Sequence, residues 1–195
     1  LFEKWGLSSD ESNAVIDCLS DWVDADDLTH LNGAERNYYE AQGHPEYPRN
    51  ASYQSVEEMA LVRGMDVVAK KKPDWRNFFT LWSDGQLDVN EAPAELIEVV
   101  CGVTPEQAEA VVQLRNGPDA QPDTEDDFYF KDFGQFRSAI GMIEKDFQNI
   151  APLLSLKSAI QRVESTVIVG NHRRTIILVN RRNVNPPQYL AWLEP

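Results

Sequence analysis

The hydrophobic pattern of this 195-residue chain changes its period at Ile160, and this change constrains the fold more than any other feature. Before that point, apolar residues recur with the period of amphipathic helices, about 3.6 residues per turn. From Ile160 onward, apolar and polar residues alternate, which is typical of half-buried strands. A series of helices followed by consecutive strands predicts an α+β protein that is mostly helical and has a short antiparallel sheet.

The strands are expected within residues 158–195. Two β-branched runs, residues 163–169 and 175–179, flank Gly170-Asn171, a pair typical of a tight hairpin turn. Residues 188–193 are expected to add a third strand. Residues 157–195 hold six basic and two acidic residues, although the net charge of the whole chain is -14. The predicted sheet therefore has a different surface from the rest of the chain.

Capping signals predict where the helices begin. Asn90 is expected to cap a helix that starts just after it. This helix and the next one, joined through residues 101–104, predict a helix-hairpin-helix or SAM-like unit over residues 90–116. Three capping boxes, in which a serine or threonine is followed three residues later by Glu or Gln, predict further starts at Ser8/Glu11, Ser55/Glu58 and Thr104/Gln107.

An acidic stretch follows the first predicted helix, which is expected to end near Asp24. Carboxylates at the C-terminal end of a helix oppose its dipole, so a nearby cation would stabilise them. Calcium, which takes about six to eight oxygen ligands, is the simplest cation for such a set. Five carboxylates fall within fifteen residues: Asp21, Asp24, Asp26, Asp27 and Glu35.

The twelve residues from Asp24 to Glu35 have the length of an EF-hand loop, but not its pattern. The fifth and sixth positions are Leu28 and Thr29, where that motif requires an oxygen ligand and a glycine. We therefore predict a structural calcium site of irregular geometry, with a solvated acidic turn as the alternative. Its predicted ligands are Asp24, Asp26, Glu35 and Asn50, and its secondary candidates are Asp21 and Asp27.

The composition argues against several other functions. A net charge of -14 repels phosphate backbones, and residues 88–115 hold six carboxylates and one arginine. Phosphate-binding glycine loops are absent, and none of the three histidines pairs with a nucleophile at a recognisable spacing. We therefore predict no catalytic residue, no cofactor-binding residue, no small-molecule substrate and no nucleic acid. The alternatives left open are an acidic calcium-binding interaction module, a nucleic-acid-binding helix-hairpin-helix module and a carboxylate-based hydrolase.

The two cysteines are far apart in sequence and have no metal-ligand spacing. Cys18 and Cys101 each lie on an apolar helical stripe, so buried free thiols are expected. A disulfide between them is the alternative in an oxidising compartment. No segment approaches the ~18 to 20 apolar residues of a membrane helix, so any membrane anchor is expected upstream of Leu1.

Several motifs follow one another in order along the first part of the chain. They are Asp21-Trp22-Val23-Asp24-Ala25-Asp26-Asp27, Gly33-Ala34-Glu35, Tyr38-Tyr39, Asn50, Ser55-Val56-Glu57-Glu58-Met59 and Leu87-Asp88-Val89-Asn90-Glu91-Ala92-Pro93. In order and spacing, over roughly residues 10–115, this set resembles the K-type minor pseudopilins of the type II secretion system. One departure is Asp88-Val89-Asn90-Glu91, where the family more often has Asn-x-Asn-Thr.

The resemblance implies a large helical domain inserted in a small pilin-like α/β domain. Residues 1–20 would lead into the helical domain, residues 21–157 would form it, and residues 158–195 would return as pilin-like strands. It also implies the periplasmic domain of a bacterial protein anchored in the inner membrane by an N-terminal helix. Such a protein would lie at the pseudopilus tip with the I- and J-type minor pseudopilins, and would help to start and cap pseudopilus assembly. Members of the family bind calcium in the helical domain, which implies the same for the acidic stretch.

Overall fold

The computed structural model describes residues 1–83, 85–122 and 124–194. The chain divides into two compact units, Leu1–Leu81 and Trp82–Pro195. This division differs from the predicted domain boundaries at residues 20/21 and 157/158, which stay predictions. Among the described residues, none of the helices combines the length and the apolar character that a membrane span requires.

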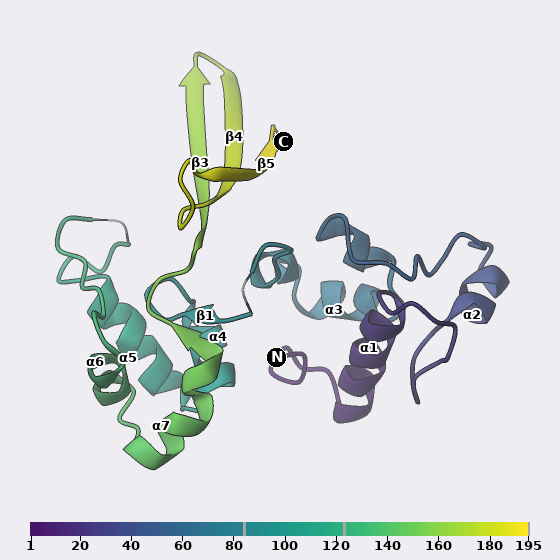
Figure 1. Cartoon of the computed structure of the whole chain (residues 1–195), viewed down its shortest axis with the longest axis horizontal. Coiled ribbons are helices and arrows are strands. Elements are labelled where there is room, and N and C mark those ends of the chain that lie inside the picture. The colour runs from purple at the N-terminus through teal and green to yellow at the C-terminus, as the bar shows by residue number, and fades with distance from the viewer. Residues whose placement is uncertain (84, 123, 195) are drawn as a thin grey trace. The chain divides into compact units, whose positions relative to one another are not determined.

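The first unit is helical. Its α-helices are α1 (Ser9–Asp21), α2 (Arg36–Ala41) and α3 (Met65–Lys71), and two short 3-10 helices span Glu57–Leu61 and Trp75–Phe78 (Figure 1). The capping box predicted at the start of α1 is confirmed, because Ser8 accepts from the Glu11 amide and Glu11 accepts from the Ser8 amide. α1 ends at Asp21, three residues earlier than expected.

The capping box predicted at Ser55 is wrong. The Glu58 amide does donate to the Ser55 hydroxyl, but the Glu58 carboxylate does not accept from the Ser55 backbone amide, as a capping box requires. That carboxylate instead accepts from the Trp22 indole, the Arg49 guanidinium and the Gln54 amide. Tertiary contacts therefore replace the local cap, and the segment forms one 3-10 turn in place of the expected helix.

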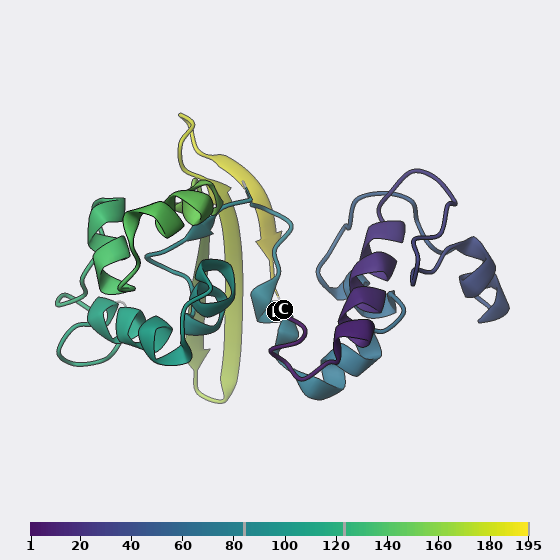
Figure 2. The same ribbon diagram turned by 90° about the horizontal axis from the view of Figure 1, so that it is seen from below.

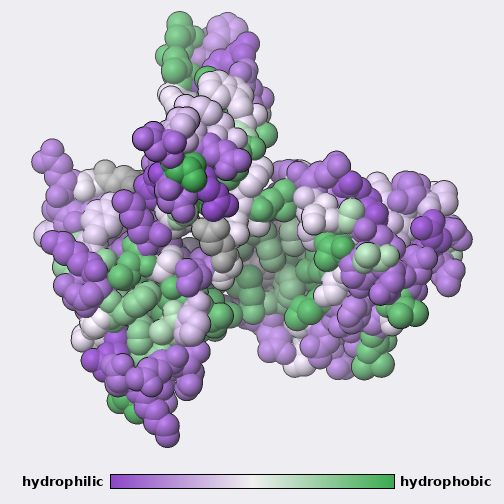
Figure 3. Space-filling view, viewed as in Figure 1, coloured by the Kyte–Doolittle hydropathy of each residue, from purple (hydrophilic) through white to green (hydrophobic). Residues whose placement is uncertain are grey.

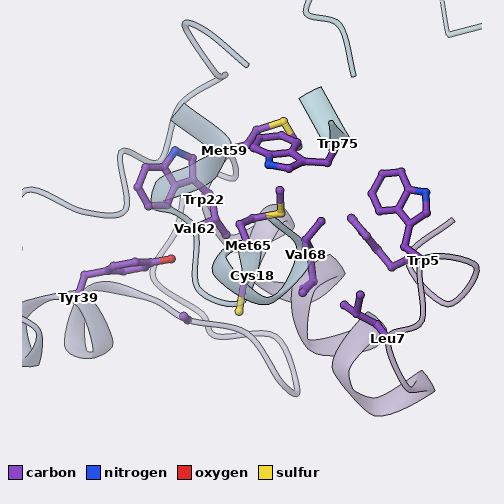
Figure 4. Close-up of a cluster of buried hydrophobic side chains, with 13 residues drawn as sticks. Trp5, Leu7, Cys18, Trp22, Tyr39, Met59, Val62, Met65, Val68 and Trp75 are labelled. Carbon is purple, nitrogen blue, oxygen red and sulfur yellow. The ribbon is translucent and has the colours of Figure 1, made fainter. Parts of the chain in front are cut away.

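The core of the first unit contains several aromatic and sulfur-containing side chains. Trp22 and Trp75 are fully buried, at 0% exposure. Gly64, with φ of 87°, starts α3 and lies against Val15 of α1, which brings the two helices together. The labelled side chains of this core are Trp5, Leu7, Cys18, Trp22, Tyr39, Met59, Val62, Met65, Val68 and Trp75 (Figure 4).

The second unit begins with a helical region that has its own core. It contains α4 (Ala94–Cys101), α5 (Pro105–Arg115), α6 (Phe133–Ala139), α7 (Glu144–Ile150) and the 3-10 turn Ala151–Leu153. The capping box at Thr104 and Gln107 is confirmed at the start of α5. α4 and α5 are joined by residues 102–104, and the helix-hairpin-helix assignment stays a prediction. Residues buried in this core include Ile97, Phe136, Ile140 and Leu154.

Asn90 does not cap α4, which corrects the expectation from the sequence. Pro93 occupies the cap position. The Asn90 amide instead donates to the carbonyls of Phe130 (3.1 Å) and Leu156 (2.8 Å) and accepts from the Phe130 amide (2.8 Å). Nearby, β1 (Leu87–Asp88) pairs in parallel with β2 (Leu154–Ser155). Asn90 therefore joins three segments that are distant in sequence.

The second unit ends in the three-stranded antiparallel sheet that the sequence predicted. Its order is β3 (Ile160–Val169), β4 (His172–Arg181) and β5 (Gln188–Leu193), with β3 and β4 joined through Gly170-Asn171. The β3–β4 hairpin extends away from the helices of the same unit, and β5 runs along β4 (Figure 1, Figure 2). At the free end of this hairpin, hydrophobic residues lie on one side and hydrophilic residues on the other (Figure 3).

One face of this sheet is apolar and exposed. Side chains alternate along β3, so Val163, Val167 and Val169 share a face, at 40%, 57% and 69% exposure. The strand register places Leu178 and Trp192 on the same face, and Trp192 is 60% exposed. Exposed apolar patches of this kind mark contact surfaces in soluble proteins.

Candidate metal centre

Asp21 reaches the interior because the residue after it is anchored in the core. Trp22 is 0% exposed, its ring contacts those of Tyr39 and Tyr47, and its indole nitrogen donates to Glu58 at 2.9 Å. This fixes the last turn of α1, and Asp21 is also 0% exposed. A carboxylate is therefore held inside the first unit by the packing of its neighbour.

The loop after α1 is tied back to the same helix. The Asn32 amide donates to Asp17 Oδ2 at 3.0 Å, and the Cys18 thiol lies 3.6 Å from the Asn32 carbonyl. A Cβ atom on Gly33 would lie 1.9 Å from Asp21 Oδ2, so a side chain at this position would displace the carboxylate. Glycine at residue 33 is therefore required by a close approach to Asp21.

Several buried oxygens in this region have no hydrogen-bond partner. The residues that carry them come from the end of α1, the loop after it, the start of α2 and the segment at Asn50. An unpartnered buried carboxylate is costly, because it loses its hydration without replacement. A bound cation would replace that hydration, so these residues fit a hard cation that prefers oxygen ligands. The atoms are Asp21 Oδ2, Asp24 Oδ1, Glu35 Oε1, Glu35 Oε2 and Asn50 Oδ1.

The electrostatics of Glu35 lead to the same conclusion. Glu35 is 3% exposed at the position preceding α2, where its side chain makes no capping hydrogen bond. Burial, followed by repulsion from the neighbouring carboxylates of Asp21, Asp24 and Asp27, raises the pKa of Glu35 to about 7. A positive charge at this place would reverse both effects, because it would stabilise the ionised carboxylate.

The spacing of the side chains also suits a metal ion. Asp21, Asp24 and His30 each offer a ligand atom, and these atoms lie within 4.8 Å of one another. Two oxygens that each lie about 2.3–2.6 Å from one calcium ion can be at most about 5.2 Å apart. The three side chains can therefore converge on a single cation with small adjustments.

The sequence and the structure agree on part of the candidate set. Asp24, Glu35 and Asn50 carry buried oxygens without a partner, as expected of ligands. Asp21 was only a secondary candidate, yet it is the most buried of the acids. These assignments, and calcium itself, stay predictions.

The other two predicted acids have other contacts. Asp26 is exposed, and its Oδ1 accepts from the Leu28 amide at 2.8 Å, which closes a local turn. The Asp27 side chain is 60% exposed and accepts from the Asn50 amide nitrogen at 3.2 Å. Asn50, with φ of 47°, also donates to the Asp26 carbonyl at 2.8 Å, so it joins its own segment to the acidic loop.

His30 was missed by the sequence reasoning. Its backbone amide donates to Asp21 Oδ1 at 3.1 Å, and its ring nitrogen Nδ1 contacts the same oxygen. The hydrogen bond to Asp21 raises the pKa of His30. The available signal was a histidine within the acidic loop, three residues before Gly33. Its spacing alone did not distinguish it from a surface residue.

Comparisons with known proteins agree with the fold and the motifs. Residues 1–72 match the family described as "Type II secretion system (T2SS), protein K". Type II secretion system protein K of Pseudomonas aeruginosa is 25% identical over 187 residues, which cover 93% of this chain and 51% of the relative. The chain thus spans about half the length of that relative.

A solved structure is similar over the whole chain. It belongs to the crystal structure of the GspK-GspI-GspJ complex from the type 2 secretion system of enterotoxigenic Escherichia coli. The TM-score is 0.68 at 17% identity, and the match covers 100% of this chain and 67% of that chain. This similarity shows a common fold of helices and a small antiparallel sheet. Residues 1–72 thus match protein K of the type II secretion system in sequence, and the whole chain is similar in fold to a chain of the solved complex.

Proposed function

We propose that this chain is the periplasmic part of a minor pseudopilin at the tip of a type II secretion pseudopilus. The observation that carries this proposal is the fold similarity over the whole chain to a chain of the GspK-GspI-GspJ complex, joined to the family match of residues 1–72. The role is structural and has no catalytic step. The protein would help to start and cap pseudopilus assembly for export across the outer membrane.

The partners in this proposal are the I- and J-type minor pseudopilins. The name of the similar solved complex supports this, because it joins one protein of each type. The test is co-expression of this chain with the soluble parts of the I- and J-type proteins from the same genome, followed by size-exclusion chromatography. We expect the three to elute together, and elution of this chain alone would contradict the proposal.

The proposal also assigns an arrangement to the domains. The helical region would be an insertion in a small pilin-like α/β domain, and the sheet β3–β4–β5 would be the part of that domain seen here. The apolar face that bears Val167 and Trp192 requires a cover, because an amphipathic sheet buries its apolar face against another element. We propose that the N-terminal anchoring helix of the pilin-like domain is this cover.

The fluorescence of Trp192 can test this packing. A longer form of the protein, with the periplasmic part of the preceding segment, is compared with residues 1–195. Both forms carry Trp82→Phe and keep the buried Trp5, Trp22 and Trp75. Acrylamide is expected to quench Trp192 less in the longer form, because the helix would cover the ring. A Trp192→Phe variant of each form supplies the background. Equal quenching of the two forms would show that the helix packs elsewhere.

Calcium is proposed as a structural ion in the first unit. Its double positive charge would neutralise the buried carboxylates. Asp21, Asp24, Glu35 and Asn50 would hold it through the oxygens that have no partner. Because these residues come from the end of α1, the acidic loop, the start of α2 and the segment before Ser55, their convergence would order the loop between α1 and α2.

Calorimetric titration of the chelated protein with calcium tests this site. We expect one ion to bind and Glu35→Gln to weaken its affinity by at least about tenfold, because a neutral amide replaces a charged ligand. The matched control is Glu40→Gln, which removes the same charge from an exposed position of α2. No heat of binding in the wild type, or equal losses in the two variants, would contradict the site.

A further inference from the structure

The position of His30 extends the proposed calcium site. Its ring nitrogen Nδ1 contacts Asp21 Oδ1 and lies 3.9 Å from Asp24 Oδ2. The ring comes from the loop between α1 and α2, whereas both carboxylates lie at the end of α1 or just after it. One nitrogen donor therefore faces the two acids that carry unpartnered oxygens.

This geometry is fixed by more than the histidine side chain. The His30 backbone amide also donates to Asp21 Oδ1, so the backbone holds the ring beside the carboxylate. Gly33 closes the same loop over Asp21, and the His30 carbonyl accepts from the Gly33 amide at 2.9 Å. These backbone hydrogen bonds hold the imidazole near the acids, so its position does not depend on the side-chain rotamer alone.

The donor set is unusual for calcium. Calcium takes oxygen ligands, whereas an imidazole nitrogen beside carboxylates suits zinc, cobalt and other divalent first-row metals. Glu35 adds a second, independent sign of a ligand, because it is 3% exposed and neither of its carboxylate oxygens has a partner. An ion bound between Asp21 and Asp24 would have both kinds of donor within reach.

We propose that this site also binds a divalent transition metal, with His30 as its nitrogen ligand and Asp21 and Asp24 as oxygen ligands. The proposal rests on the metal site proposed above and concerns its selectivity. Calcium would use the oxygen donors alone, and the imidazole would remain outside its coordination shell. The two classes of ion would compete for one place, and only the transition metal would depend on His30.

Cobalt(II) is a suitable probe, because its visible absorption reports a nitrogen ligand and the geometry of the site. The chelated protein is titrated with Co²⁺, and Ca²⁺ is then added in excess. We expect one equivalent of Co²⁺ to bind and calcium to displace it. His30→Gln is expected to weaken Co²⁺ binding by at least about tenfold and to change calcium affinity by less than about threefold.

His44→Gln is the matched control. His44 is also exposed and also contacts a carboxylate, with Nδ1 3.2 Å from Glu46 Oε1, but it does not belong to the group formed by Asp21, Asp24 and His30. We expect this variant to bind Co²⁺ as the wild type does. Circular dichroism checks that both variants keep the helical content of the wild type.

The outcomes separate this proposal from the calcium site. If calcium binds but Co²⁺ does not compete with it, or if His30→Gln and His44→Gln bind Co²⁺ equally, the transition-metal site is overturned and the calcium site stands. If neither ion binds, both are overturned. If Co²⁺ binds, is displaced by calcium and loses affinity only in His30→Gln, the proposal is supported.

Discussion

Glu35 in the first unit and Asn90 in the second are polar side chains placed within a folded unit, but their surroundings differ. Asn90 makes three hydrogen bonds, to Phe130 and Leu156, with lengths between 2.8 and 3.1 Å. Glu35 is 3% exposed, and both of its carboxylate oxygens lack a partner. The second unit thus satisfies its polar junction from its own backbone.

The difference indicates which part of the protein depends on its solution conditions. Unpartnered oxygens on Asp21, Asp24 and Asn50 surround the acidic loop in the same way. A buried charge without a partner favours the unfolded state, in which water solvates it. We therefore expect the stability of the first unit to depend on cations, and the stability of the second to be the same with and without them.

The largest expected effect comes from breaking the Asn90 junction. Asn90→Ala would leave the Phe130 amide and two carbonyls without partners, at a cost of about 3–5 kcal/mol in the free energy of unfolding. Urea denaturation measures this loss. The loss in the free energy of unfolding should be the same whether calcium or a chelator is present. Asn149→Ala, at an exposed position of α7, is the control and should change stability by less than about 0.5 kcal/mol. A loss that depends on calcium would break the contrast between the two units.

The next effect is the stabilisation by calcium. An ion that binds only the folded state adds about 2.7 kcal/mol at a concentration one hundred times its dissociation constant. The double variant Asp21→Asn, Glu35→Gln should lose this gain, as measured by thermal melting with and without calcium. Without the ion, the single variant Glu35→Gln should melt no lower than the wild type, because it removes a buried charge that Asp21 and Asp24 repel and leaves the contacts of Asp21 with His30 in place. A large loss of stability in ion-free Glu35→Gln would show that the Glu35 carboxylate has a partner within the protein.

The sequence predicted those parts of the fold that depend on local signals. The capping boxes at Ser8 and Thr104 and the hairpin at Gly170-Asn171 involve residues only a few positions apart, and all three are confirmed. The parallel pairing of Leu87 with Leu154 joins segments 67 residues apart, which no local pattern encodes. Asn90 was misassigned for the same reason, because its partners Phe130 and Leu156 are distant in sequence.

The candidate site was predictable as a region, but not atom by atom. The acidic pattern identified the stretch from Asp21 to Glu35, since charges at a helix end are visible in a sequence. Which carboxylates turn inward depends on the packing of Trp22 and on the approach of Gly33, and both are tertiary. The sequence therefore contained no sign that Asp21 is fully buried or that His30 contacts it.

A smaller effect is expected from pH in the ion-free protein. The pKa of Glu35 is raised from 4.5 to about 7 in the folded state, so the folded state binds more protons than the unfolded state between these values. Stability should therefore fall as the pH rises from about 4.5 to about 7 and then level off. Melting temperatures of the chelated wild type and Glu35→Gln, followed across this range, measure the difference. Parallel profiles would show that Glu35 does not carry this dependence, and Glu40→Gln should resemble the wild type.

The smallest effect is expected at Asp26, which the sequence ranked among the main ligands. Its carboxylate accepts only the Leu28 amide in an exposed turn, whereas its backbone carbonyl accepts from Asn50 and is unchanged by substitution. Asp26→Ala should therefore cost less than about 1 kcal/mol and leave the affinity for calcium within about threefold of the wild type, as measured by calorimetric titration. Asp24→Ala, which removes one of the unpartnered oxygens, should weaken calcium binding far more. If the two variants lose affinity equally, Asp26 turns inward when the ion binds, and the exposed turn at Leu28 belongs to the ion-free protein alone.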